Sequence, residues 1–245
     1  MTGHVFLVGA GPGDLGLITV KGLEILRSAE VVVYDALANP LLLKECPNAE
    51  IIDAGKRNSK HKMSQTDINS LLVSLGKEGK RVVRLKGGDP FLFGRGAEEA
   101  AALREAGVGV SVVPGVSSSI AVPELAGIPV THRDHSPMVT FITGHEMDDK
   151  VNNVDWKRLA EGMGTIVVLM GMSNADTISR SLIKGGMPPG TKASITVSGS
   201  TEKERTVVTT ISELNNSIKE EELEAPGIIV IGNVVSERKK LGDLR

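Results

Sequence analysis

The residues best suited to chemistry lie in one segment, which runs from Arg84 to Glu99. An apolar run ends at Leu85, and two glycines, Asp89 and a proline follow it directly. In open α/β sheets, ligands bind at the carboxyl ends of the strands, so a binding site is expected here. The Asp89 carboxylate can accept a hydrogen bond from an ammonium or hydroxyl group, and glycine lets a ligand approach the backbone closely. A plain surface turn is the alternative.

Arg95 and Glu98 stand three residues apart, where a helix is expected to begin. Side chains at this spacing share one face of a helix, so the carboxylate can hold the guanidinium in place. A guanidinium binds a carboxylate in a planar two-point geometry that an ammonium group does not reproduce. The pair is therefore predicted to form at the strand end where a binding site is expected. A surface charge pair at a helix start is the alternative.

A second glycine-rich segment, Gly9-Ala10-Gly11-Pro12-Gly13-Asp14, follows the first apolar run of the chain. It invites a dinucleotide-binding interpretation, but the third glycine comes too early for the Rossmann pattern. Asp14 would also place a negative charge where a phosphate should bind. The segment instead predicts a loop that receives a neutral or cationic ligand against its backbone, or an ordinary turn at the end of a strand.

Two later segments carry weaker signals. Ser117 and Ser118 can cap a helix without any ligand. His132 and Arg133 follow a short apolar run and can face a cleft, although a lone histidine is more often structural. No metal site is predicted, because the spacing of His132, His135 and His145 matches no zinc or iron arrangement. The serine elbow of hydrolases and the Walker phosphate loop are both absent from the sequence.

Composition excludes several classes of protein. The 245 residues include 28 Lys plus Arg against 30 Asp plus Glu, so the net charge is −2, and aromatic residues make up only 2%. A nucleic-acid binder is therefore not expected, because it would show a basic excess or a base-stacking surface. A single cysteine, Cys46, excludes an internal disulfide framework. Without an apolar stretch of about 20 residues or a signal peptide, we expect a soluble, cytoplasmic protein with no membrane partner.

The elements that must position these residues follow from apolar periodicity. In the first half, short apolar runs alternate with amphipathic stretches, which predicts an α/β fold with a mostly parallel sheet. The expected strands there are 5–8, 31–34, 51–53, 82–85 and 110–113, and the expected helices are 18–27, 64–75 and 97–106.

A segment rich in glycine and proline, 114–137, separates this half from the next. The second half predicts strands at 139–143, 165–170, 194–197, 206–209 and 228–231, and helices at 117–125, 155–161, 174–183 and 211–221. A short polar link, 199–205, makes two of these strands hairpin-like. We therefore predict two α/β domains, residues 1–113 with a mostly parallel sheet and residues 114–245 with a mixed sheet.

Taken together, the motifs resemble the tetrapyrrole (corrin/porphyrin) methylase family over essentially the whole chain. The parts found across the family are the Gly-Pro-Gly-Asp loop at 11–14, the Gly-Gly-Asp-Pro loop at 87–90 and Leu-Met-Gly at 169–171. Narrower parts are similar to members that act on uroporphyrinogen III, at 34–35, 55–57, 84–90, 93–96, 127–133 and 143–145. The resemblance implies two α/β domains of the class III methyltransferase fold, S-adenosylmethionine in the cleft between them, and a homodimer.

The resemblance also implies roles for individual residues. The cofactor contacts that it implies are Pro12, Gly87, Gly88, Asp89, Leu92, Ser117, Ser118, Met170, Gly199 and Gly227. The substrate contacts that it implies are Asp35, Lys56, Arg57, Arg133 and Met170. The chain departs from the family in two places: residues 199 and 227 are usually alanine, and a stretch of small residues with a tyrosine is replaced here by 122–125.

The expected activity is C-methylation of uroporphyrinogen III at C-2 and C-7, which gives precorrin-2 for siroheme or cobalamin synthesis. S-adenosylmethionine has no phosphate, which fits a glycine loop that carries an acidic residue. Uroporphyrinogen III is a polycarboxylate, and the basic side chains of Lys56, Arg57, Arg95 and Arg133 can bind it despite the net negative charge. With this substrate, Arg95 is expected to be the catalytic residue that orients the substrate and handles a proton, with Glu98 holding it. The alternatives are another family member, such as a precorrin methyltransferase or a diphthine synthase, an NAD(P)-binding oxidoreductase, and a non-catalytic S-adenosylmethionine sensor.

Overall fold

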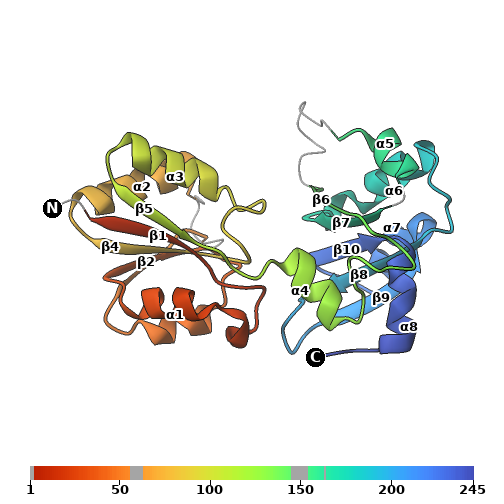
Figure 1. Ribbon diagram of the computed structural model, residues 1–245, viewed down its shortest axis with the longest axis horizontal. Helices are drawn as coiled ribbons and strands as arrows, with labels where there is room; N and C mark the ends of the chain where they lie inside the picture. Colours follow the sequence, from red (N-terminus) through yellow and green to blue (C-terminus); the bar gives the residue numbers. More distant parts are fainter. Residues whose placement is uncertain (1–2, 56–62, 145–153, 163) are drawn as a thin grey trace. The chain divides into compact units, whose positions relative to one another are not determined.

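The computed structural model describes residues 3–55, 63–144, 154–162 and 164–245. The chain forms two compact units, Met1–Ser117 and Ser118–Arg245, which are described separately below (Figure 1). The sequence placed the boundary between domains slightly earlier, after residue 113. None of the helices in the described ranges combines the length and the apolar character needed to cross a bilayer.

Unit 1 is built on a five-stranded sheet with the order β3-β2-β4-β1-β5. Each pair of neighbouring strands in it is parallel. The strands are β1 (His4–Gly9), β2 (Val31–Tyr34), β3 (Glu50–Asp53), β4 (Arg81–Lys86) and β5 (Gly109–Val113). Because all five run the same way, the loops that leave their carboxyl ends lie at one edge of the sheet.

Helices cover both faces of this sheet, and this explains its continuous apolar strands (Figure 1). On one face lie α2 (Gln65–Lys77) and α3 (Gly96–Glu105), and on the other lie α1 (Val20–Arg27) and the 3₁₀ helix η2 (Pro40–Glu45). A capping box opens α2, where the Asp67 amide donates to Ser64 Oγ at 3.2 Å and the Ser64 amide donates to Asp67 Oδ2 at 3.0 Å.

Unit 2 is built on a mixed five-stranded sheet with the order β6-β7-β10-β8-β9. Strands β6 (Val139–Thr143) and β7 (Thr165–Leu169) pair in parallel. Strands β8 (Lys192–Val197), β9 (Arg205–Thr210) and β10 (Gly227–Ile231) pair antiparallel. The hairpin expected from the short polar link is the β8–β9 pair.

Two helical layers enclose this second sheet. One contains α6 (Ala175–Lys184) with α5 (Trp156–Glu161) and α7 (Leu214–Glu220) beside it, and the other contains α4 (Ser118–Leu125) and the 3₁₀ helix η6 (Asn233–Glu237). The sequence did not predict η2, η6 or the short α8 (Arg238–Leu241) that follows η6. With its two sheets and flanking helices, the chain has the α/β fold class that the sequence predicted.

Candidate active site

Three glycine loops meet at the carboxyl edge of the unit 1 sheet. Gly11 and Gly88 exchange backbone hydrogen bonds, with Gly88 N donating to Gly11 O at 2.7 Å and Gly11 N donating to Gly88 O at 3.3 Å. A Cβ atom built on Gly9 would lie 2.6 Å from the Gly88 carbonyl oxygen and 2.6 Å from the Gly115 nitrogen. The loops after β1, β4 and β5 therefore pack backbone against backbone, and glycine is required because no side chain fits between them.

Asp89 holds this junction together. Its Oδ1 accepts from the amides of Phe91 at 2.8 Å and Leu92 at 3.0 Å, and its Oδ2 accepts from the Gly115 amide at 3.1 Å. The carboxylate thus shapes its own loop and ties it to the loop after β5. A carboxylate has about four acceptor positions, so it retains capacity for a ligand. Direct contact between Asp89 and an ammonium group stays a prediction.

Asp14 has a structural role in the first glycine loop. Its Oδ1 accepts from the Gly16 amide at 2.7 Å and caps the 3₁₀ helix η1 (Leu15–Leu17). Helix α1 begins only later, at Val20, and Thr19 caps it. A dinucleotide site would need amides at a helix N-terminus aimed at a phosphate. Here the Asp14 carboxylate caps η1 in the loop itself, and α1 begins six residues after Asp14, which argues against the oxidoreductase alternative.

Arg95 and Glu98 form the two-point ion pair that their spacing predicted. Arg95 Nε lies 2.8 Å from Glu98 Oε1, and its Nη2 lies 2.8 Å from Glu98 Oε2. The hydrogen bonds to Arg95 lower the pKa of the Glu98 carboxyl, and those to Glu98 raise the pKa of the Arg95 guanidinium. The Arg95 side chain is 56% exposed, so it is held in position while remaining accessible to a ligand.

The backbone is strained at Phe93 and at Arg95 itself. Phe93 and Arg95 have positive φ values of 54° and 58°, a left-handed conformation that is unfavourable for large side chains. Gly96 secures the turn by donating its amide to the Pro90 carbonyl at 3.0 Å. Strained residues persist where the surrounding structure fixes them, and they cluster at functional sites. The segment that the sequence singled out is therefore a loop with a definite shape.

Asp35 belongs to a buried ionic cluster that sequence reasoning missed. It pairs with Arg84 and lies 3.7 Å from Lys86 Nζ, and both cations also contact Glu99. Arg84 and Lys86 alternate along β4, so they point to the same face of the sheet. Arg84 and Lys86, two residues apart at the end of a strand whose other inner residues are apolar, were the signal that could have found the cluster.

In unit 2, predicted cofactor residues meet at one edge of the mixed sheet. Strand β7 ends with Leu169 opposite Ile228, and β8 ends with Val197 opposite Gly227. Met170, Gly227 and the loop that carries Gly199 therefore share an edge. The sequence placed Met170 inside the strand, which is wrong: β7 ends at Leu169, and Met170 is 46% exposed with a φ of 53°.

Two of the positions that depart from the family, Gly199 and Val122, are packing partners. A Cβ atom built on Gly199 would lie 2.5 Å from Val122 Cγ1 and closer still to Cγ2. Valine in α4 therefore fills the room that an alanine side chain would occupy. The loss of a methyl group at one position matches the gain of volume at the other.

This pairing makes a testable prediction for stability. Gly199→Ala is expected to destabilise the protein by about 1–3 kcal/mol, because the added methyl group overpacks a stiff β-branched neighbour. The double variant Gly199→Ala, Val122→Ala should lose less stability than the sum of the two single changes, as measured by urea unfolding. Gly190→Ala is the control, since a Cβ atom there meets nothing within 4 Å. Additive losses would contradict the pairing.

Arg133 lies in a tight loop whose other residues are anchored. His132 and Ser136 exchange two backbone hydrogen bonds at 2.8 Å and 2.9 Å. His135 Nε2 lies 2.7 Å from Glu237 Oε1, so the loop is attached to η6 near the C-terminus of the chain. Arg133 itself is exposed. His132 and His135 have structural contacts, whereas binding of the substrate by Arg133 stays a prediction.

The Glu237 anchor predicts a pH dependence of stability. Hydrogen bonds from Lys240 and His135 lower the pKa of Glu237 from 4.5 to about 2. A depressed pKa means that the ionised group stabilises the fold fully above pH 4.5 and loses this contribution as the pH falls towards 2. The difference in free energy of unfolding between the wild type and Glu237→Gln should therefore shrink over that interval. A difference that stays constant down to pH 3 in urea unfolding would contradict the anchor.

Several predicted residues cannot be placed. Lys56, Arg57 and His145 lie outside the described residues. Within the described ranges, no three His, Cys, Asp or Glu side chains are grouped so that they could hold a metal ion. That the protein uses no metal stays a prediction.

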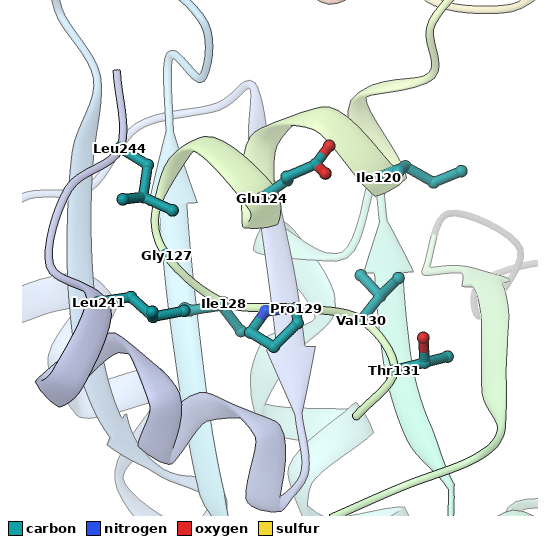
Figure 2. A pocket seen from close by; sticks show the side chains of 9 residues that line it. All are labelled: Ile120, Glu124, Gly127, Ile128, Pro129, Val130, Thr131, Leu241 and Leu244. Carbon is teal, nitrogen blue, oxygen red and sulfur yellow. The ribbon is translucent and has the colours of Figure 1, made fainter. Parts of the chain in front are cut away.

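A cavity lies within unit 2, and residues 127–131 of the motif at 127–133 line part of it (Figure 2). It has a volume of about 290 Å³, and its lining includes Ile120 and Glu124 of α4, Val130, Leu241 and Leu244. The side chains are mostly apolar, and none of the residues that line it is a predicted cofactor or substrate contact. We therefore assign it no part in the site.

Comparison with known proteins places the chain in a family. Residues 4–215 match the family described as tetrapyrrole (corrin/porphyrin) methylases. The chain is 46% identical over 245 residues to the S-adenosyl-L-methionine-dependent uroporphyrinogen III methyltransferase of Methanosarcina barkeri, covering 99% of this chain and 96% of that protein. It is 44% identical over 235 residues to the uroporphyrinogen-III C-methyltransferase of Priestia megaterium, covering 96% and 99%.

A solved structure agrees with these relatives. The crystal structure of uroporphyrin-III C-methyltransferase from Thermus thermophilus, complexed with S-adenyl homocysteine, has a TM-score of 0.81 and 36% identity, covering 96% of this chain and 99% of that one. Matches of this identity and coverage, in sequence and in structure, confirm the resemblance drawn from the motifs. The chain belongs to the tetrapyrrole (corrin/porphyrin) methylase family.

Proposed function

We propose that the protein transfers methyl groups from S-adenosylmethionine to C-2 and C-7 of uroporphyrinogen III, giving precorrin-2 through precorrin-1. The observation that carries the proposal is the near full-length similarity to enzymes of that activity, at 44–46% identity. The Thr-His-Arg segment at 131–133 and the Thr-Gly-His segment at 143–145 favour this substrate over those of a precorrin methyltransferase or a diphthine synthase.

The glycine junction of unit 1 fits S-adenosylmethionine. Gly9 packs directly against Gly88 and Gly115, so the junction is built of backbone with no side chain between the loops. Carbonyl oxygens and the acidic Asp89 suit a cation with an amino group, and no phosphate site is needed. When bound, the cofactor supplies a methyl group on a positively charged sulfur. The residues proposed to hold it are Pro12, Gly87, Gly88, Asp89, Leu92, Ser117, Ser118, Met170, Gly199 and Gly227.

Arg95 is proposed to orient the substrate. Its guanidinium is fixed by Glu98 at two points and remains more than half exposed, so it can bind a propionate or acetate group of the macrocycle. Arg133, Lys56 and Arg57 are proposed to bind further carboxylates. The pyrrole carbon that attacks must lie in line with the transferred methyl group, so the enzyme's main task is positioning.

Asp35 is proposed to contact the pyrrole N–H groups. Its side chain is 30% exposed at the carboxyl edge of the unit 1 sheet, the same edge as the glycine junction. A carboxylate accepts hydrogen bonds, and pyrrole nitrogens donate them. Methylation leaves a positive charge on the ring until a proton is lost from it, and a nearby carboxylate stabilises that charge.

The proposal is tested by following label from S-adenosylmethionine across a panel of tetrapyrroles. We expect labelled methyl groups to pass to uroporphyrinogen III and not to precorrins that already carry both methyl groups. Transfer to a later precorrin alone would support the precorrin methyltransferase alternative. S-adenosylhomocysteine should bind saturably in calorimetry and NADH should not, whereas tight NADH binding would favour an oxidoreductase.

We further propose that the protein is a homodimer, as the family resemblance implies. Sedimentation equilibrium at micromolar concentration is expected to give about twice the 25.9 kDa mass of the chain. A mass near that of one chain would contradict the prediction.

A further inference from the structure

In the ionic cluster of unit 1, three charged side chains are almost completely buried and the fourth, Asp35, reaches the surface. Arg84, Lys86 and Glu99 are 2%, 3% and 0% exposed, whereas the Asp35 side chain is 30% exposed. Resting on the function proposed above, we propose that Glu99 is a positioning residue. It holds Arg84 and Lys86, and through them it fixes the Asp35 carboxylate where the substrate's pyrrole rings bind.

The contacts form a chain from the interior to the sheet edge. Glu99 Oε1 accepts from Arg84 Nε at 3.1 Å and from Lys86 Nζ at 3.0 Å. Arg84 Nη2 then donates to Asp35 Oδ1, and Lys86 Nζ lies 3.7 Å from Asp35 Oδ2. Each oxygen of Asp35 thus has its own cation. Both cations are held from behind by one carboxylate.

Stability alone does not account for such a cluster. Moving charged groups out of water is costly, and apolar replacements of similar volume are often as stable or more stable. The cluster is balanced, with two cations and two carboxylates, so the Asp35 charge is offset without any free positive charge. What this arrangement adds is a defined place for the exposed carboxylate. Buried polar networks that are well satisfied fix a single conformation.

Glu99 uses only one of its two oxygens in this network. Gln65 Nε2 also donates to Oε1, at 3.2 Å, whereas Oε2 has no hydrogen-bond partner among the described residues. Glutamine at this position can therefore keep all three contacts through its amide oxygen and place its NH₂ group where Oε2 lies. Glu99→Gln removes the charge and preserves the shape.

Without the Glu99 charge, Asp35 would be the only carboxylate of the cluster facing the two cations. The Asp35 carboxylate should then be drawn inward, away from the sheet edge. We expect kcat for methylation to fall by about 10- to 100-fold, the effect of losing a charge-assisted contact in the transition state. The affinity for S-adenosylhomocysteine should be unchanged within about twofold, because the glycine junction does not include Glu99.

A double-mutant cycle tests this directly. The wild type, Glu99→Gln, Asp35→Asn and the double variant are compared for kcat, KM, cofactor affinity and thermal unfolding. Glu105→Gln, exposed on the same helix α3, is the control and should behave like the wild type. If Glu99 acts through Asp35, then Glu99→Gln has little further effect on kcat in the Asp35→Asn background.

Each outcome of these measurements either supports or overturns the role of Glu99 in positioning Asp35. Equal effects of Glu99→Gln in both backgrounds, or a loss of kcat that merely follows a loss of folded protein, would overturn the inference. A crystal structure of Glu99→Gln gives a readout that does not need activity. An Asp35 carboxylate that moves inward supports the proposal, and one that stays in place overturns it. A wild type that binds S-adenosylhomocysteine but methylates no tetrapyrrole would instead refute the proposed function.

Discussion

Replacing Arg95 by lysine is expected to slow methylation of uroporphyrinogen III by about 30- to 1,000-fold. Lysine keeps the charge but loses the planar fork that binds a carboxylate at two points. Losing such a contact in the transition state costs about 2–4 kcal/mol, which corresponds to that range of rates. S-adenosylhomocysteine affinity should barely change, because Arg95 is assigned to the substrate. Steady-state rates and calorimetry measure the two effects separately.

Two further variants test whether the slower methylation comes from loss of the Arg95 guanidinium. Glu98→Gln should give a smaller loss of the same kind, since Glu98 only holds the guanidinium. Arg104→Lys, exposed near the other end of α3, should have no effect. If Arg95→Lys methylates at the wild-type rate, then Arg95 is only a surface charge at a helix start. A large loss of cofactor affinity would instead show that Arg95 binds the cofactor.

Gly88→Val should weaken S-adenosylhomocysteine binding by at least about 100-fold, or about 2.7 kcal/mol. Gly88 has a φ of 64° and exchanges two backbone hydrogen bonds with Gly11. A β-branched residue is strained in that conformation, and its side chain would occupy space proposed for the ligand. Binding should therefore fail both because the loop changes shape and because the ligand is obstructed. Calorimetry measures the affinity.

Gly107→Val is the matched control for this substitution. Gly107 also has a left-handed φ, of 72°, and a Cβ atom there meets nothing within 4 Å. The two variants should lose similar thermal stability from backbone strain, while only Gly88→Val loses affinity. Near-normal affinity in Gly88→Val would remove the loop at 87–90 from the cofactor site.

The fold class was predictable because its signals are local. Strands covered on both faces are continuous apolar runs, and helices begin at capping residues such as Ser64 and Thr19. The short helices η2 and α8 were missed, since a few residues show no clear periodicity. Met170 was placed in a strand because its apolar side chain continues the pattern, and sequence does not show that its φ is positive.

The site was predictable only in part, because its contacts join distant parts of the chain. The Arg95–Glu98 pair follows from helical spacing, so the sequence predicted it. Glu99 contacts Arg84 across the space between a helix and a strand, and no local pattern shows that. The match between Gly199 and Val122 likewise depends on how α4 packs against the sheet of its own unit.

The most direct test of the central claim is the mass of the product. Purified protein is incubated with S-adenosylmethionine and enzymatically made uroporphyrinogen III, and the tetrapyrrole is analysed by mass spectrometry. The proposed activity predicts a gain of two methyl groups, with a singly methylated intermediate at early times. Uroporphyrinogen III that remains unmethylated, with protein that binds S-adenosylhomocysteine normally, would contradict it.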